Sequence, residues 1–320
     1  MSVAERIAVK AVRMTNEVVS MAVLIVILLL LAYGCYAIWD LGKVYHAADS
    51  MRYSTYKPAA DNPLSFQELQ AINPEVFAWL TVYGTHIDYP VVQGKNNLKY
   101  INTNALGKYA LTGAIFLDTH NSLDFTDFNS IVYGHHMDKD TMFGEISSFA
   151  DPAYFQAREY GTLYFNGQDH GLVFFAFLNA DAYDTAVFRP GIRGQEQQQA
   201  YLDMLLGKAV NVRSEVSVGI GDRIVMLSTC SSASTNGRAI LVGKLTDETY
   251  GDPFYSTQTA KLSQLSGIDR LPETWSGMPF VGKIGTLVLP FVLIVMASIL
   301  AFERRAYARR RRESKGQQRR

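Results

Sequence analysis

The chain has 320 residues, of which 48% are hydrophobic and 19% charged. This composition excludes an intrinsically disordered chain, and the presence of only two cysteines excludes a small domain held together by disulfides. The formal net charge is zero, because 30 Lys and Arg balance 30 Asp and Glu, but the charges are spread unevenly. Residues 303–320 alone carry nine basic and two acidic side chains. The basic charge is therefore concentrated at one end of the chain.

Two long uncharged runs predict membrane-spanning helices. The first, residues 18–39, holds 22 residues; at about 1.5 Å per residue its length of about 33 Å matches the hydrocarbon core of a bilayer. The second, residues 284–302, holds 19. A buried core helix is the alternative for both, but core helices seldom stay apolar on every face. A cleavable signal peptide is the alternative for the first, but this run is longer than usual and residues 33–39 are too bulky for a cleavage site.

Basic residues beside both runs predict their orientation. Lys10 and Arg13 precede the first run, and the basic tail 303–320 follows the second. Because Lys and Arg in short flanks stay on the cytoplasmic side, we expect both termini inside a two-pass membrane protein and residues 40–283 outside the cell. The tail would also be attracted to anionic membrane lipid, which explains its charge better than nucleic-acid binding does.

The expected organisation has seven parts. These are a cytoplasmic N-terminus (1–17), a transmembrane helix (18–39), an extracellular stalk (40–64), a catalytic domain (65–255), an extracellular linker (256–283), a second transmembrane helix (284–302) and a basic cytoplasmic tail (303–320).

The exterior domain is expected to be mainly β. Eight short runs rich in Val, Ile, Phe and Tyr alternate with turn residues, which favours a barrel or a sandwich over a parallel α/β sheet. The runs are residues 76–82, 89–92, 114–117, 130–133, 161–165, 172–178, 223–229 and 239–245. Short helices are expected at 65–71, at 151–159, where Asp151 and Pro152 form an N-cap and a first turn, and at 195–206.

Three kinds of reactive side chain stand at strand ends. The run 130–133 leads into Gly134, His135 and His136, the run 223–229 leads into Cys230, and Arg238 opens the run 239–245. A thiol is a nucleophile, an imidazole can exchange its proton, and a guanidinium can stabilise a developing oxyanion. Together they suit acyl transfer.

Each of these residues also has a structural alternative. Cys230 could simply be buried, since Cys35 lies in the first apolar run and cannot pair with it. His135 and His136 would face opposite ways on a strand, so only one of them can serve a site. Arg238 could be a solvated charge. A zinc site lacks ligands, and no phosphate loop or dinucleotide motif is present, so we expect no cofactor.

Several segments resemble the sortase family of Gram-positive cell walls. The sequence MLSTC at 226–230, with Arg238 downstream, resembles the Thr-Leu-x-Thr-Cys signature, and NSIVYGHHM at 129–137 resembles the Gly-His segment. Residues 87–102 and 113–143 are similar to class B sortases in particular. The resemblance covers residues 65–250 and rests on three separated segments in the expected order.

This resemblance implies an eight-stranded β-barrel with a few short helices, flanked by the two transmembrane helices. It also implies a membrane-anchored cysteine transpeptidase that cleaves the sorting signal of an exported protein after Thr and joins that protein to a cell-wall amine, such as a peptidoglycan precursor. By the same resemblance Cys230 is the nucleophile, His135 the general acid and base because it directly follows Gly134, and Arg238 the oxyanion and substrate-positioning group.

The resemblance also suggests residues for substrate binding and for calcium. Ser228 and Thr229 are expected to line the substrate groove. Should calcium be needed, as in some sortases, Asp118, Asp124 and Asp127 are the first residues to consider.

The sequence departs from the class B pattern in two places, and other functions remain open. Met226 replaces the first threonine of the signature, and the second apolar run is more typical of pilus-building class C enzymes, although their Asp-Pro-aromatic lid motif is absent from residues 40–75 and occurs instead at 252–254. A pilin-polymerising sortase, with a pilin amine as acceptor, is therefore an alternative. So are a cysteine peptidase that transfers to water and a membrane-tethered scaffold in which Cys230 is inert.

Overall fold

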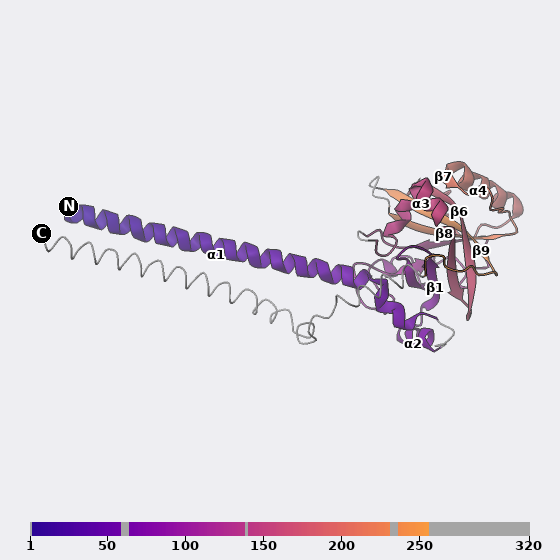
Figure 1. The fold of residues 1–320 in the computed structure, drawn as a ribbon, viewed down its shortest axis with the longest axis horizontal. Coiled ribbons are helices and arrows are strands. Elements are labelled where there is room, and N and C mark those ends of the chain that lie inside the picture. Colours follow the sequence, from indigo (N-terminus) through magenta and orange to yellow (C-terminus); the bar gives the residue numbers. More distant parts are fainter. Residues whose placement is uncertain (1, 59–63, 138–139, 231–235, 256–320) are drawn as a thin grey trace. The chain divides into compact units, whose positions relative to one another are not determined.

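The computed structural model describes residues 2–58, 64–137, 140–230 and 236–255. Figure 1 shows their elements in chain order. The predicted linker 256–283, the second apolar run 284–302 and the basic tail 303–320 lie outside the described residues, and what the sequence predicts for them stays a prediction.

The first element is a long helix, α1 (Val3–Ala48), which contains the predicted span 18–39. It begins with a capping box, in which the Ser2 hydroxyl accepts from the Glu5 amide and the Glu5 carboxylate accepts from the Ser2 amide. Within α1 the stretch Met14–Gly42 is long and apolar enough to cross a membrane, and its side chains are not buried by the rest of the chain. By length and composition, α1 therefore suits a membrane anchor.

The expected stalk, residues 40–64, is folded in its described part. Helix α1 continues to Ala48, and a 3-10 helix, η1 (Ser50–Tyr56), follows after Asp49 caps it. Tyr53 is buried in the main core, and Lys57 pairs with Asp88 at 2.8 Å. Tyr53 is buried by residues distant in sequence, among them Tyr89, and no local pattern in the sequence indicates these contacts.

Nine strands follow, and the eight expected runs each fall on one of them. The strands are β1 (Val76–Val82), β2 (Asp88–Val92), β3 (Ile115–Leu117), β4 (Asn129–Tyr133), β5 (Tyr160–Phe165), β6 (Gln168–Asp181), β7 (Ala209–Val212), β8 (Arg223–Cys230) and β9 (Gly237–Thr246). The ninth, β7, was not predicted because it has four residues, of which only two are half-buried and two are exposed.

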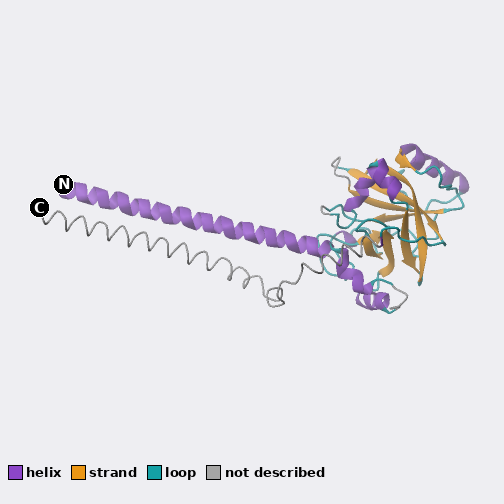
Figure 2. Cartoon of the chain, in the orientation of Figure 1, coloured by secondary structure: helices purple, strands orange, loops and turns teal. Residues whose placement is uncertain are grey.

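The strands close into a barrel, which confirms the predicted fold (Figure 2). Their order is β5-β1-β2-β3-β4-β8-β9-β6, and β6 pairs again with β5 to complete the ring of eight, while β7 pairs with β6 outside it. The pairs β2–β3 and β4–β8 are parallel, and the others are antiparallel.

Short helices lie between the strands. They are α2 (Ser65–Ile72), η2 (Lys99–Ile101), η3 (Gly144–Ala150), α3 (Pro152–Ala157) and α4 (Gln195–Lys208). Helix α3 starts as expected, with the Asp151 side chain accepting from the Tyr154 amide and Pro152 in the first turn. These elements cap and cover the barrel without interrupting its ring.

Strands β4, β8 and β9 are buried on both faces. Successive residues alternate between two cores: Val132, Leu227 and Leu241 belong to the main core, whereas Ile131, Met226 and Ile240 belong to a second core that also contains Tyr201, Leu202 and Leu205 of α4. This explains why the three strands read as continuous apolar runs. The two cores together hold the three strands rigidly, and the predicted site residues stand at their ends.

Candidate active site

The register of three neighbouring strands brings the predicted catalytic positions into one row. Tyr133 on β4 is paired with Ser228 on β8, and the Gly134 amide donates to the Ser228 carbonyl at 3.1 Å. His135 lies two residues beyond Tyr133, and Cys230 lies two residues beyond Ser228. On the other side of β8, Cys230 is paired with Arg238 of β9. The backbone of Cys230 is therefore flanked by the chain segments that carry His135 and Arg238.

Two side chains beside this row lie on the outer face of the barrel. Ile131, Met226 and Ile240 belong to the core under α4, and every second residue along a strand shares a face. Ser228 is two residues from Met226 on β8, and Arg238 is two residues from Ile240 on β9, so both share that outer face. The side chain of Cys230 lies outside the described part of the structure, which places its backbone opposite Arg238.

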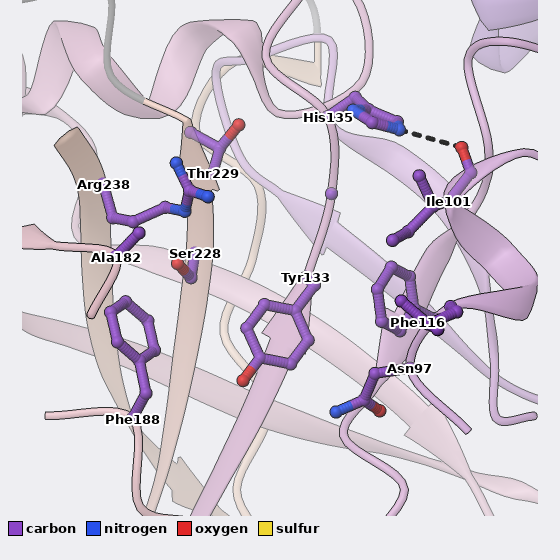
Figure 3. Close-up of a pocket in the computed structure, with 12 residues that line it drawn as sticks. Asn97, Ile101, Phe116, Tyr133, His135, Ala182, Phe188, Ser228, Thr229 and Arg238 are labelled. Atoms are coloured by element: carbon purple, nitrogen blue, oxygen red, sulfur yellow. Dashed lines mark hydrogen bonds between the residues drawn. The ribbon is translucent and has the colours of Figure 1, made fainter. Parts of the chain in front are cut away.

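A cavity of about 330 Å³ opens beside this row (Figure 3). Tyr133 lies in its middle, Ser228, Thr229 and Arg238 form one side, and the segment 97–101 forms another. Its lining residues are Asn97, Leu98, Ile101, Phe116, Tyr133, Gly134, His135, Ala182, Phe188, Ser228, Thr229 and Arg238. All five residues predicted for the site except Cys230 therefore line one cavity.

The loop between β6 and α4 supplies one wall of the cavity, and buried side chains hold this loop in place. Asn129, which has no exposed surface, donates to the Arg189 carbonyl at 2.7 Å and accepts from the Ile192 amide at 2.9 Å. Tyr201 of α4 donates to the Val187 carbonyl at 2.6 Å. Because these bonds flank Phe188, that wall is fixed by the core.

His135 is half-buried, and one of its ring nitrogens has a fixed partner. Its Nε2 lies 2.9 Å from the carbonyl oxygen of Ile101 (Figure 3). Since a carbonyl oxygen can only accept, Nε2 carries a hydrogen in this bond, and Nδ1 is the nitrogen left to take up or release a proton. The Ile101 carbonyl therefore orients the imidazole and selects its tautomer.

His136 is in a different environment. It forms an isolated β-bridge with Met142, and its Nδ1 is buried without a hydrogen-bond partner among the described residues. It does not line the cavity, whereas His135 does. The two adjacent histidines are therefore in different surroundings, and the catalytic role expected for His135 from its place after Gly134 stays a prediction.

Arg238 brings a permanent positive charge to the cavity. Its side chain is half-buried, and a guanidinium nitrogen donates to the Gly237 carbonyl at 3.1 Å. Within the described part of the chain no carboxylate forms an ion pair with it. A guanidinium offers five N–H donors in a planar fork, so most of them are available to an anionic oxygen in the cavity.

Ser228 and Thr229 both border the cavity and carry unpaired hydroxyls, which lie on opposite faces of β8. Both residues are at most 2% exposed, and neither hydroxyl has a hydrogen-bond partner among the described residues. A buried polar group without a partner carries a desolvation cost, and a ligand that supplies the partner removes that cost. The two hydroxyls therefore suit a polar ligand such as a peptide backbone.

A buried carboxylate, not predicted from the sequence as part of the site, organises one end of the cavity. Asp118 is 4% exposed and accepts hydrogen bonds from Asn97 at 2.8 Å, from the Tyr133 hydroxyl at 3.1 Å and from the amide and ring of His120, each at 2.9 Å. Burial and the nearby Asp118 raise the pKa of Tyr133 above its ordinary value, so the phenol stays protonated and donates.

The three aspartates considered for calcium do not share one set of partners. The Asp118 carboxylate is occupied as described, Asp124 accepts from Thr126, and Asp127 accepts from Asn121 and Ser122. Among the described residues, the group whose ligand atoms come within 4.8 Å of one another is His86, Asp140 and Glu145. There Glu145 already accepts from His86 and Tyr154.

Comparison with known proteins identifies close relatives. No model of a known protein family matches the chain. Sortase B of Staphylococcus aureus is 31% identical over 185 residues, which are 56% of this chain and 74% of that protein. Sortase B of Listeria monocytogenes is 30% identical over 190 residues, 56% of this chain and 73% of that protein. The crystal structure of sortase B from the type II pilus of Streptococcus pneumoniae is 48% identical, with a TM-score of 0.51, and matches 57% of this chain and 99% of that one.

The hydrogen bonds of Asp118 yield a prediction for stability. We expect Asp118→Ala to lower the free energy of unfolding by roughly 2 kcal/mol, or the melting midpoint by about 4–8 °C, because it leaves the donors of Tyr133 and Asn97 unpaired. Thermal unfolding of the full-length protein in detergent measures this. Asp124→Ala, which removes local bonds to Ser122 and Thr126, is the control, and an equal loss in both variants would contradict the prediction.

Proposed function

This chain belongs to the sortase family, and from that membership we propose that it cleaves the sorting signal of an exported protein and transfers the carboxyl end of that protein to an amine. Its homologues are cysteine transpeptidases, and the chain is an enzyme of the same type. The observation that carries the proposal is the single row formed by the segments of His135, Cys230 and Arg238 beside one cavity.

The first half of the proposed reaction forms a thioester. The Cys230 thiolate attacks the carbonyl carbon of the threonine in the sorting signal, and Arg238 stabilises the oxyanion that results. As the C–N bond breaks, His135 in its protonated form gives a proton from Nδ1 to the departing amine. Most N–H donors of the Arg238 guanidinium are available to the oxyanion, which supports the role of Arg238. The bond from Nε2 to the Ile101 carbonyl leaves Nδ1 for proton transfer, which supports the role of His135.

The second half returns the enzyme to its starting state. An incoming amine attacks the thioacyl carbon, His135 accepts the proton that this amine loses, and the Cys230 thiolate departs. A new amide bond has then replaced the old one, and the proton that His135 takes from the incoming amine replaces the one it gave to the departing amine. Ser228 and Thr229 are proposed to line the groove that binds the signal, because both border the cavity.

Two acceptors are consistent with this chemistry. A cell-wall amine would make the enzyme a wall-anchoring sortase, as the class B relatives suggest. The 48% identity to a sortase B from a type II pilus favours a pilin amine as the second candidate. Water as acceptor would make it a peptidase instead; a ligated product in the presence of an added amine would separate the two activities.

The proposed location is the cell membrane, with the catalytic barrel outside the cell. The apolar stretch of α1 supports one crossing, and the uncharged run 284–302 with its basic flank supports a second crossing and two cytoplasmic termini. A barrel held at the outer surface would meet its substrates as they emerge from the membrane.

The nucleophile gives the most direct prediction. We expect Cys230→Ala to reduce transpeptidation of a sorting-signal peptide to background, because no other group in the row can form the acyl-enzyme. Mass spectrometry of the wild type, incubated with peptide and no amine, should detect a thioester on Cys230. Cys35→Ala, a change in α1 remote from the cavity, is the control and should react at the wild-type rate. Normal turnover by Cys230→Ala would end the proposal.

The two adjacent histidines give a matched pair. We expect His135→Gln to lower kcat by about 10³-fold, since a general acid and base contributes roughly 10²–10⁴-fold. His136→Gln, one residue away but outside the cavity lining, should stay within about threefold of the wild type. Steady-state kinetics with peptide and amine measure both. The reverse ranking would assign the proton transfer to His136.

Topology can be tested with single cysteines in a chain carrying Cys35→Ala and Cys230→Ala. We expect Ser217→Cys, exposed on the barrel, to react with a membrane-impermeant thiol reagent on intact cells, and Ser314→Cys in the basic tail to react only after permeabilisation, because the tail is expected inside. Labelling of Ser314→Cys on intact cells would exclude a cytoplasmic C-terminus.

A further inference from the structure

The loop that carries His135 is held by backbone contacts with Met142 and Phe143, where the chain turns back. In its described part, His136 forms a β-bridge with Met142, and the Phe143 amide donates to the His135 carbonyl at 3.0 Å. The backbone position of His135 is therefore set by the backbone of Met142 and Phe143. Any contact that fixes these two residues therefore also fixes the backbone from which the imidazole extends.

Met142 has a backbone conformation that needs support. Its φ is +53°, in the left-handed region that residues other than glycine seldom adopt, and its side chain is 3% exposed. Its amide donates a hydrogen bond of 2.9 Å to the hydroxyl oxygen of Tyr89. This phenol, on β2, thus holds Met142 from outside the loop.

The same hydroxyl also contacts the end of the long N-terminal helix. Tyr89 is 2% exposed and donates to the carbonyl of Ala48, the last residue of α1, at 2.8 Å. Tyr53 of η1 packs edge-on against the Tyr89 ring, with 6.5 Å between ring centroids. One phenol oxygen therefore accepts from the His135 loop and donates to the end of α1.

We propose that Tyr89 is a positioning residue for His135, and that it couples the end of α1 to the placement of the catalytic imidazole. When Ala48 is in its buried place, its carbonyl holds the Tyr89 hydrogen and points the oxygen lone pairs at the Met142 amide. When Ala48 is displaced, the hydroxyl loses the acceptor that orients it, and the left-handed turn at Met142 loses support. The proposal rests on the proposed function, because it assumes that His135 moves the proton.

The first test is the removal of one oxygen atom in the full-length enzyme in detergent. We expect Tyr89→Phe to lower kcat about tenfold with KM unchanged, because a displaced imidazole slows proton transfer without altering the cavity that binds the peptide. Tyr83→Phe is the matched control, because it also removes one tyrosine hydroxyl from the barrel domain. The Tyr83 hydroxyl bonds to Thr162 and to the Tyr250 carbonyl, and it makes no contact with the described part of the His135 loop. Its kcat should stay at the wild-type value.

The outcomes of this test separate the two proposals. Activity that persists in Cys230→Ala would overturn the proposed function itself. Activity that requires Cys230 but is unchanged in Tyr89→Phe would overturn only the role of Tyr89. So would equal losses of kcat in Tyr89→Phe and Tyr83→Phe, or a rise in KM, because these would indicate a general loss of structure.

A double-mutant cycle tests the link to α1. The Asp49 carboxylate accepts from the Met51 amide at 2.9 Å and so fixes the turn directly after Ala48. We expect Asp49→Ala to lower kcat about threefold in the wild type and to have no further effect in Tyr89→Phe, because both changes break one chain of contacts. Independent, multiplicative losses would show that the end of α1 and Tyr89 act separately, and would overturn the coupling.

Discussion

The parallel pairing of β4 with β8, flanked by the antiparallel pairing of β8 with β9, is the constraint on which the candidate site depends. A shift of one residue in either pairing would move a whole strand face to the other side of the sheet. Burial on both faces prevents such a shift, because Ile131 and Val132, like Met226 and Leu227, belong to different cores. The alignment of the backbone positions of His135, Cys230 and Arg238 thus follows from the packing of apolar side chains several residues away.

The cavity itself combines rigid and polar parts. Strands supply Tyr133, Ser228 and Arg238, whereas the segment 97–101 and the loop after β6 supply the walls. Loops are usually the mobile parts of a fold, but here Asn129 and Asp118 tie both walls to the barrel through buried hydrogen bonds. Binding a peptide in a preformed cavity of this kind costs little ordering of the protein.

Much of this organisation could be predicted from the sequence. Periodicity and turn residues located eight of the nine strands and three of the helices, because those features are local. The catalytic candidates stood at strand ends beside recognisable motifs. Asn97, Asp118 and Phe188 were not identified as site residues, because what makes them part of the site is contact with residues distant in sequence. The fold of the stretch after α1 was missed for the same reason, since Tyr53 is buried by distant partners.

The hydrogen bond between His135 and Ile101 has a consequence for the order of events. With Nε2 engaged by a carbonyl, Nδ1 is the one nitrogen of His135 left for the proposed proton transfers. In the proposed reaction this nitrogen serves both the amine that leaves and the amine that arrives, so the two amines use the same space in turn. The second amine can then enter only after the cleaved peptide has left. The enzyme would therefore follow a double-displacement scheme, in which slow release of the cleaved peptide delays attack by the second amine.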